Sequence, residues 1–408
     1  MLEQTQDEQE IIERVAALDI GKAELVCCAR VPDPGGGSRR VQEVVTYSTM
    51  TRSLQVMADR LLDLGVTRVV MEATSDYWKP PFYLLEAHGF EVWLVNARDV
   101  KNLPGRPKTD RLDAIWLCKV AERQMLRPSF VPPIPIRRLR DLTRYRVALI
   151  ADRTAEKQRV EKLLEDAQIK LSVVASDIFG VSGRDMMAAM IGGQRDPKVL
   201  AQLARSRMRV KIPALEEAFV GYFTDHHRFL LTKMLARIDQ LSADITDLDT
   251  QIEADLAPFA EAAARLDDIP GVGPTAAAVI IAEVGLDMTR FPTPAHLASW
   301  AKFAPGVKES AGRSKGNGST GHGDRYLARV LGERYRRIAR RRGKKKAIVA
   351  VGRSILVITW HLLSDDNTQF HDLGSGYYDS RINPERKKRN HIRELQALGY
   401  KVTLEPAA

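Results

Sequence analysis

The stretch Val15-Ala-Ala-Leu-Asp-Ile-Gly-Lys22 decides how the first third of this chain folds. Five of its first six residues are apolar, which predicts a buried strand, and Gly21 with Lys22 marks the turn that ends it. The exception within the strand is Asp19. A carboxylate in a buried strand costs free energy unless it is paired or binds a metal, so Asp19 marks a candidate site.

The segments that follow predict the fold class. Two more strand-like runs come next, and helical and strand-like runs then alternate. Three strands joined by turns can form an antiparallel meander, and the later helices allow parallel crossovers. The sequence therefore predicts an α/β domain with an RNase H-like fold. Its further elements are the strands 23–31, 40–46, 68–72 and 91–96 and the helices 51–64, 80–89 and 111–122.

Three more acidic residues stand at telling places in this order. Glu72 ends the run Arg-Val-Val-Met-Glu, and Asp110 and Asp113 begin a predicted helix. Residues three apart project from one helix face, so both could reach a cluster with Asp19. Phosphodiester chemistry can use two Mg²⁺ ions held about 4 Å apart by such carboxylates. The opposing interpretation is that the helical pair only caps its helix and that Glu72 ends its strand in solvent.

The composition narrows the class of partner. The chain has 408 residues, of which 44% are hydrophobic and 28% charged, and this suits two or three globular domains. A net charge of +10 favours nucleic acid as a partner over a merely basic surface. The three cysteines lack the spacing of a zinc site or a disulfide framework, which predicts reduced, buried thiols.

The beginning of the chain and its hydropathy bear on location. The first ten residues are polar and acidic, unlike a secretory signal. No run approaches the ~18 apolar residues that a membrane span needs. We therefore expect a cytoplasmic protein with no membrane partner.

A proline-rich segment, 128–135, predicts a linker and a domain boundary. Two long helical stretches follow, at about 137–174 and 215–256. The second stretch carries an apolar stripe that suits a coiled coil or a bundle, and a dimer seam and packing within the chain are equally open. The stripe consists of Leu235, Ile238, Leu241, Ile245, Leu248 and Ile252.

The turn Ile269-Pro-Gly-Val-Gly-Pro274 resembles the hairpin of helix-hairpin-helix modules. In those modules glycine lets the backbone approach a DNA phosphate at a helix N-terminus. The first turn of an ordinary core helix looks similar, so this motif alone is not decisive.

A loop rich in Gly, Ser and Lys spans residues 304–323 and contains Ser310. A serine hydroxyl surrounded by cations can attack a phosphate, and Lys308, Arg313 and Lys315 lie close in sequence. Composition does not distinguish this serine from its neighbours Ser314 and Ser319.

The segment 325–346 is strongly basic, with eleven Lys or Arg residues against one acid. A one-sided excess beside a polar loop favours contact with a phosphate backbone over a merely solvated face. The candidate residues are Arg325, Arg329, Arg336, Arg337, Arg340, Arg341 and Arg342.

Six motifs, read together and in order, carry a resemblance to a known family. They are Ala-Leu-Asp-Ile-Gly-Lys, Met-Glu-Ala-Thr, Lys-Thr-Asp-Arg-Leu-Asp-Ala, Ile-Pro-Gly-Val-Gly-Pro, Pro-Gly-Val-Lys-Glu-Ser-Ala-Gly and Gly-Asp-Arg-Tyr-Leu-Ala-Arg-Val-Leu. The chain resembles, from Val15 to about Leu331, the bacterial DEDD transposases of insertion-sequence family one hundred and ten, the bridge-RNA-guided recombinases. This resemblance implies a RuvC-like domain, a coiled-coil middle and a C-terminal transposase domain.

The resemblance also implies roles and partners. Asp19, Glu72, Asp110 and Asp113 become a quartet that binds Mg²⁺ (or Mn²⁺), and Ser310 becomes the nucleophile. The family assembles dimers into a tetramer, in which the quartet and the serine come from different protomers. Its partners are donor DNA, target DNA and a structured noncoding RNA, the bridge RNA, which implies a nucleoid-associated protein in a bacterial cytoplasm.

We therefore expect four regions. These are a RuvC-like catalytic domain at 12–127, a linker and coiled-coil domain at 128–260, a mainly helical transposase domain with the helix-hairpin-helix-like element at 261–365, and a tail of unassigned role at 366–408.

Two other functions compete with a transposase. A metal-dependent, structure-selective nuclease of the RuvC type would cut DNA with water and would need the quartet but not Ser310. A non-catalytic RNA- or DNA-binding scaffold would need neither, and the intact quartet argues against it.

Overall fold

A computed structural model of the chain describes residues 11–35, 39–73, 75–96, 109–304, 309–310, 313–314, 323–330, 344–371 and 384–404. The chain divides into two compact units, Met1–Pro132 and Pro133–Ala408. This division falls inside the proline-rich segment 128–135. The helical middle and the segments after it belong to one unit, so the boundaries at 260/261 and 365/366 stay predictions.

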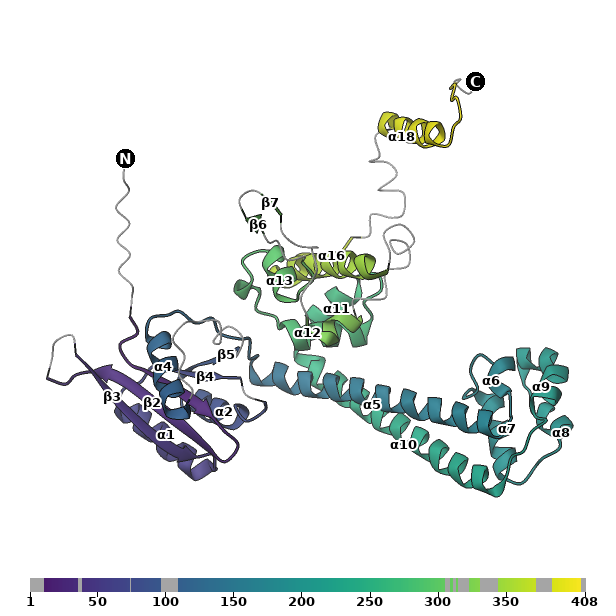
Figure 1. Cartoon of the computed structure of the whole chain (residues 1–408), viewed down its shortest axis with the longest axis horizontal. Coiled ribbons are helices and arrows are strands. Elements are labelled where there is room, and N and C mark those ends of the chain that lie inside the picture. The colour runs from purple at the N-terminus through teal and green to yellow at the C-terminus, as the bar shows by residue number, and fades with distance from the viewer. Residues whose placement is uncertain are drawn as a thin grey trace. The chain divides into compact units, whose positions relative to one another are not determined.

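The first unit is built on a five-stranded sheet with the order β3-β2-β1-β4-β5 (Figure 1). The first three strands pair antiparallel, whereas β1 with β4 and β4 with β5 pair parallel. The predicted mixed α/β sheet is confirmed. Its strands are β1 (Val15–Ile20), β2 (Glu24–Pro32), β3 (Arg40–Ser48), β4 (Arg68–Glu72) and β5 (Glu91–Val95).

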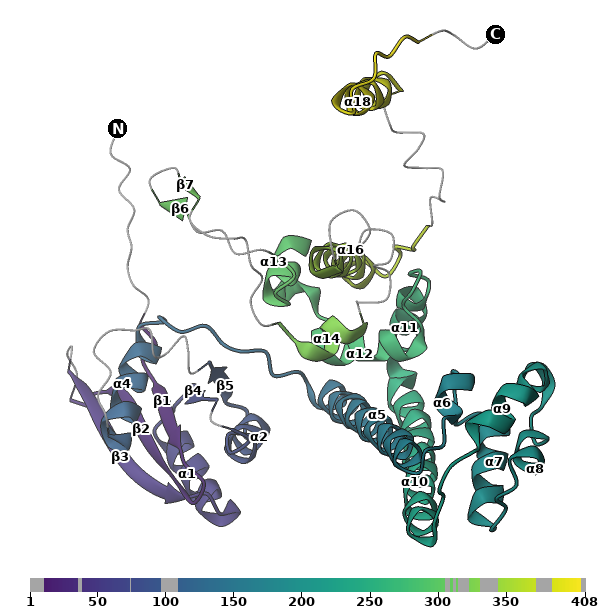
Figure 2. The same ribbon diagram turned by 45° about the vertical axis from the view of Figure 1, so that its right-hand side comes forward.

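Helices cover both faces of this sheet. Alternate residues of β1 point to opposite faces, so the strand contributes side chains to two separate cores. Leu18 and Ile20 pack in one core with α1 (Thr51–Asp63) and α2 (Lys79–Ala87). Val15 and Ala17 pack in a second core with the helix α4 (Asp110–Glu122). Figure 2 shows α4 on one face of the sheet and α1 with α2 on the other.

The three cysteines are free and buried within these layers. Cys118 of α4 donates a long hydrogen bond from Sγ to the carbonyl oxygen of Val15, at 3.6 Å. Burial raises the pKa of Cys27 far above that of an exposed thiol. These residues therefore serve as small core side chains.

The second unit begins with two long helices, α5 (Ile134–Asp166) and α10 (Asp225–Leu256), which lie side by side (Figures 1 and 2). The predicted apolar stripe of α10 faces α5 of the same chain. Leu241 and Ile245 share a core with Leu149, and further along Leu235 shares one with Val160. These residues of the stripe therefore pack against α5 of their own chain, and a dimer seam formed by the same helices stays a prediction.

Both long helical stretches are shorter than predicted, and the two interruptions touch. Helix α5 ends at Asp166, and Gln168 takes a left-handed φ of 60°. The second stretch breaks before α10, where Tyr222 donates its N–H to the carbonyl oxygen of Ala167 at 2.8 Å. A Cβ at Gly221 would lie 2.5 Å from that same oxygen, so only glycine allows this approach.

A set of short helices fills the interval between α5 and α10 and shares one core with their ends. A small group of short helices therefore packs at the ends of α5 and α10, in place of the continuous helices that were predicted there. Its elements are α6 (Leu171–Val174), α7 (Val181–Ile191), α8 (Pro197–Ala201), η1 (Ser206–Lys211) and α9 (Ile212–Ala218).

The remainder of the second unit packs around α12 (Pro274–Val284), whose residues from Ala276 to Val284 are all buried. Short 3₁₀ turns η2 (Ala257–Phe259) and η3 (Met288–Arg290) join its helices. The other elements are α11 (Ala260–Asp267), α13 (Pro294–Trp300), the strand pair β6 (Glu309–Ser310) and β7 (Arg313–Ser314), α14 (Arg325–Val330), α16 (Lys344–Ser364) and α18 (Pro384–Ala397).

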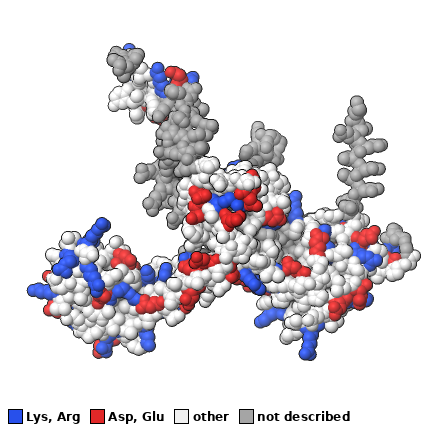
Figure 3. All heavy atoms as spheres, turned by 180° about the vertical axis from the view of Figure 1, so that it is seen from behind, with Lys and Arg blue, Asp and Glu red and all other residues white. Residues whose placement is uncertain are grey.

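Two general features of the surface bear on function. None of the helices in the described part of the chain has the length and apolar character that a membrane crossing requires. On the face seen in Figure 3, Lys and Arg side chains lie interspersed with Asp and Glu. The strongest basic excess of the sequence, at 331–343, lies outside the described residues.

The packing of α10 on α5 leads to a stability prediction. Leu241→Ala should lower the free energy of unfolding by about 2–3 kcal/mol, because it removes buried methyl groups and leaves a cavity. Denaturant titrations at two protein concentrations should give the same loss, since the contact lies within one chain. Leu395→Ala, at a residue that is 42% exposed, is the control and should change little. A loss that grows on dilution would instead indicate a dimer seam.

Candidate active site

Pairing of the strands brings two of the predicted carboxylates together. In the parallel pair of β1 with β4, Leu18 lies opposite Met71. Asp19 and Glu72 are the next residue on each strand, so they lie side by side at the carboxyl ends of adjacent strands. Both side chains are partly buried.

Both carboxylates also belong to the face of the sheet that α4 covers. Along β1, Val15 and Ala17 pack against α4, and Asp19 is the next residue on that face. Along β4, Val70 packs in the same core and is followed on that face by Glu72. The pleat of the two strands therefore turns the pair toward α4.

Helix α4 runs antiparallel to β1, which brings its first turn to the same end of the sheet. Its last residue, Glu122, accepts a hydrogen bond from the N–H of Ile12 at 3.0 Å, just before β1 begins. From Cys118, which contacts Val15, eight residues of helix lead back about 12 Å to Asp110. Four residues of strand lead about 13 Å from Val15 to Asp19. Asp110 and Asp19 therefore lie at about the same height along the direction of β1.

The helical pair does not serve as the cap of α4. Thr109 is the N-cap residue, and its Oγ1 accepts a hydrogen bond from the N–H of Leu112 at 3.4 Å. Asp110 and Asp113 lie in the first turn, with Asp110 exposed and Asp113 partly buried. The capping interpretation of the two residues is therefore wrong, although their charges still complement the helix dipole.

Four carboxylates are a donor set that fits a divalent metal ion, because Mg²⁺ and Mn²⁺ prefer hard oxygen ligands. Among the described residues, however, no three His, Cys, Asp or Glu side chains lie close enough together to hold an ion. The four side chains share one end of the layer, and holding a common ion would require them to turn toward one another.

Ser310 lies in the second unit, in a short strand pair. Strands β6 and β7 pair antiparallel, and Ser310 lies opposite Arg313, one of the cations predicted to assist it. Lys308 and Lys315, the two other predicted cations, lie outside the described residues. The quartet and the serine thus belong to different units, each with its own core.

The basic segment is described only in part. Arg325 opens α14, is exposed and donates from Nη2 to the Tyr326 hydroxyl at 2.7 Å, and Arg329 lies in the same helix. The other predicted phosphate contacts, Arg336, Arg337, Arg340, Arg341 and Arg342, lie outside the described residues.

The turn before α12 lines an open cleft of about 890 Å³. Gly271 has a φ of 86°, which favours glycine, and a Cβ there or at Gly273 would meet open space. The lining is mainly apolar and includes Ile150 and Ile252. The helix-hairpin-helix interpretation of this turn stays a prediction.

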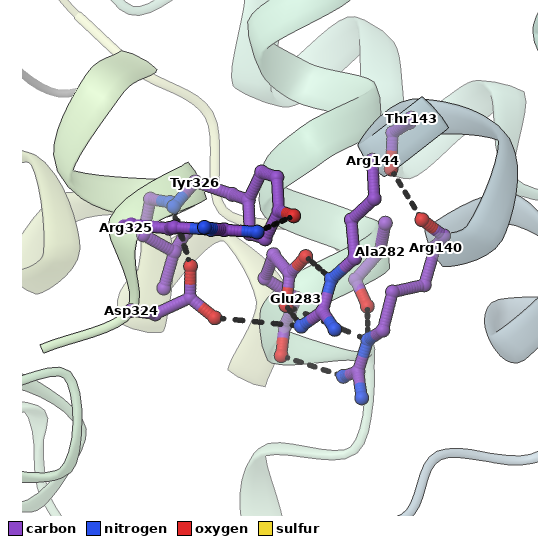
Figure 4. A network of polar contacts seen from close by, with 9 residues as sticks. Arg140, Thr143, Arg144, Ala282, Glu283, Asp324, Arg325 and Tyr326 are labelled. Carbon is purple, nitrogen blue, oxygen red and sulfur yellow. Dashed lines mark hydrogen bonds and ion pairs between the residues drawn. The ribbon is translucent and has the colours of Figure 1, made fainter. Parts of the chain in front are cut away.

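Sequence reasoning missed a buried ionic network around Glu283 of α12, which is 1% exposed (Figure 4). Arg144 of α5 donates from Nε and Nη2 to its two carboxylate oxygens, at 2.8 and 2.7 Å. Arg140 donates to the carbonyl oxygens of Ala282 and Glu283, at 2.8 and 3.0 Å. The signal that could have found it is one carboxylate in an apolar run, Val-Ile-Ile-Ala-Glu-Val, at 279–284.

The network carries an electrostatic cost as well as a gain. Burial raises the pKa of the Glu283 carboxyl, and the hydrogen bond from Arg144 opposes that shift. A buried ion pair of this kind adds little net stability, but removing one partner leaves the other charge uncompensated. Its main effect is therefore to fix how α5 meets α12.

Two models of protein families match parts of this chain. A DEDD transposase model of the IS110 type, described as a transposase, matches residues 16–169. A second model, described as transposase IS116/IS110/IS902 family, matches residues 263–349. The first unit, a mixed sheet flanked by helices, is compatible with a DEDD nuclease-like domain.

Individual relatives agree with these matches. The chain is 25% identical, over 301 residues, to an uncharacterized 43.6 kDa protein of insertion element IS110 from Streptomyces coelicolor, covering 68% of this chain and 73% of that protein. It is 28% identical over 256 residues to an uncharacterized 44.8 kDa protein of insertion element IS116 from Streptomyces clavuligerus, covering 57% and 62%. It is 24% identical over 297 residues to a probable family 20 transposase from Pseudomonas aeruginosa, covering 72% and 77%.

Removing the buried carboxylate should destabilise the second unit. Glu283→Ala should lower the free energy of unfolding by about 3 kcal/mol, because Arg144 loses its hydrogen-bond acceptor and Arg140 loses the carboxylate oxygen that lies 3.5 Å from its Nε. Chemical denaturation measures this loss. The control Glu161→Ala, at an exposed residue of α5, should change it by less than about 0.5 kcal/mol. Equal effects of the two variants would contradict the network.

Proposed function

Because this chain belongs to the IS110/IS116 family of transposases, we propose that it excises and inserts a mobile DNA element by Mg-assisted, serine-linked strand cleavage and exchange. The observation that carries the proposal is the register of β1 with β4. It puts Asp19 and Glu72 side by side, facing the helix whose first turn bears Asp110 and Asp113.

In the proposed reaction, Ser310 is the nucleophile. Its Oγ forms a bond to a backbone phosphorus, the serine proton passes to a base, and one P–O ester bond of the DNA breaks. The departing strand end takes up a proton and becomes a free hydroxyl. The phosphodiester energy is kept in the serine ester, so a hydroxyl of another strand can reverse the step and join a new end.

The carboxylate quartet holds the metal in this proposal. A bound divalent ion supplies positive charge that stabilises the phosphorus-centred transition state. The quartet carboxylates would orient it, and Arg313, opposite Ser310 in the strand pair, adds charge from the protein. Without the serine, the same quartet would suit a nuclease that cuts with water.

The partners in the proposal rest on the family resemblance. They are donor and target DNA together with a structured noncoding RNA that pairs with both. We place the quartet and the serine of one active site on different protomers of a tetramer, in the bacterial cytoplasm at the nucleoid. The location of the two groups in separate units is consistent with this arrangement.

The two halves of the proposed site can be tested separately. In cells that carry the element with its flanking noncoding RNA, Asp19→Asn and Ser310→Ala should each lower recombination about a hundredfold or more. The matched controls Asp59→Asn, at an exposed residue of α1, and Ser314→Ala should recombine normally. Normal recombination by Ser310→Ala alone would leave the water-cutting nuclease, and normal recombination by both variants would reject the site.

The basic segment should govern affinity without sequence preference. Replacing Arg340, Arg341 and Arg342 with Gln should weaken binding to DNA of any sequence. It should also make the slope of log K against log salt concentration shallower by up to about 2.7, because each lost phosphate contact accounts for about 0.9. Binding titrations over a salt series measure this slope. An altered sequence preference with an unchanged slope would indicate base readout instead.

A further inference from the structure

The network around Glu283 extends beyond the two long helices. The guanidinium of Arg144 also faces Asp324, with Nη2 3.7 Å from Oδ2, and lies 4.8 Å from the centre of the Tyr326 ring (Figure 4). Asp324 and Tyr326 stand at the start of α14. One side chain of α5 therefore contacts both the central helix α12 and the beginning of α14.

Asp324 has a second task at the same place. Its Oδ1 accepts hydrogen bonds from the N–H groups of Tyr326 and Leu327, at 2.7 and 3.0 Å. These are N–H groups that a helix start leaves without partners in the helix. Asp324 thus fixes the start of α14 with one oxygen and faces Arg144 with the other.

Directly before Asp324, the chain closes on itself. A Cβ at Gly323 would lie 2.4 Å from the carbonyl oxygen of Ala301, so the two backbones touch there. The chain between these two points contains Ser310. The segment that carries the serine therefore leaves and returns at one base, and Asp324 ties the returning end of that base to Arg144.

Arg144 also has a particular place in the chain. It lies about three turns into α5, which begins within the proline-rich segment 128–135, two residues after the first unit ends at Pro132. Its neighbour Arg140 is bonded to the backbone of α12. The start of α5 is thus held against the helices from which the serine segment extends.

We propose that Arg144 is a positioning residue for Ser310. Arg144 binds both carboxylate oxygens of Glu283 and faces Asp324 and Tyr326, and it thereby fixes the base of the serine segment relative to α5. This inference rests on the proposed role of Ser310 as nucleophile. Arg144 does not act on the DNA itself. Its loss changes the rate of serine attack and leaves DNA affinity intact, because the nucleophile is misplaced rather than removed.

The test uses the full-length protein with its noncoding RNA, donor DNA and Mg²⁺, and compares two identical substitutions on one helix. Arg144→Lys keeps the charge but loses the planar fork that binds both oxygens of Glu283. Arg146→Lys makes the same change two residues further along α5, where the arginine pairs with Asp249 of α10. The covalent protein–DNA adduct is followed in time at saturating DNA, and DNA affinity is measured separately.

Arg144→Lys should slow adduct formation at least about tenfold, with DNA affinity within about twofold of the unchanged protein. Arg146→Lys should leave both quantities within about twofold. Hydrogen exchange gives a readout that does not depend on the chemistry: the amides of Tyr326 and Leu327 should lose protection in Arg144→Lys only. Asp324→Asn, which keeps the helix cap but loses the charge, should also slow the adduct and serves if Arg144→Lys does not fold.

Equal adduct rates for Arg144→Lys and Arg146→Lys would overturn the positioning role while leaving Ser310 as nucleophile. Absence of any Ser310-dependent adduct in the unchanged protein would overturn the proposed function and this inference with it. Loss of DNA affinity in Arg144→Lys, in proportion to the loss of rate, would also contradict positioning, since it would assign Arg144 to binding.

Discussion

The parallel pairing of β1 with β4 is the contact on which the first unit and its site depend. It sets a register in which Leu18 meets Met71, and this register alone brings Asp19 beside Glu72. A slip of β4 by one residue against β1 would turn Glu72 into the opposite core, where its burial would cost several kcal/mol. The same pairing that buries the apolar residues therefore also presents two acids to α4.

The second unit depends on the burial of a charged side chain, Glu283. Glu283 is the single charge among the buried residues of α12, and its burial is tolerable only with Arg144 and Arg140 in place. This requirement specifies how α5 and α12 meet. Because Arg144 also faces Asp324, the geometry extends to the base of the segment that carries Ser310.

Much of the first unit could be predicted from sequence, because alternation along strands and caps of helices are local signals. The run from Val15 to Ile20 and the burial cost of Asp19 predicted both a strand and a site. Strand order supplied the rest, since β1 and β4 must be neighbours for Asp19 and Glu72 to meet.

The second unit was harder to predict for physical reasons. The breaks near Ala167 and Gly221 stabilise one another across more than fifty residues, so neither is apparent from its own propensity. Arg144 and Glu283 are 139 residues apart, and an arginine on an amphipathic helix looks like any solvated one. Ser310, Ser314 and Ser319 lie in the same loop with similar neighbouring residues, so the family resemblance alone selects Ser310.

The most direct measurement is the identity of the residue that becomes linked to DNA. The protein, its RNA and donor DNA would be trapped with denaturant during reaction, digested, and the nucleotide-bearing peptide sequenced by mass spectrometry. We expect a phosphodiester-linked nucleotide on Ser310, and none when Asp19 is replaced by Asn. A linkage on another residue, or DNA cleaved with no linked peptide, would contradict it.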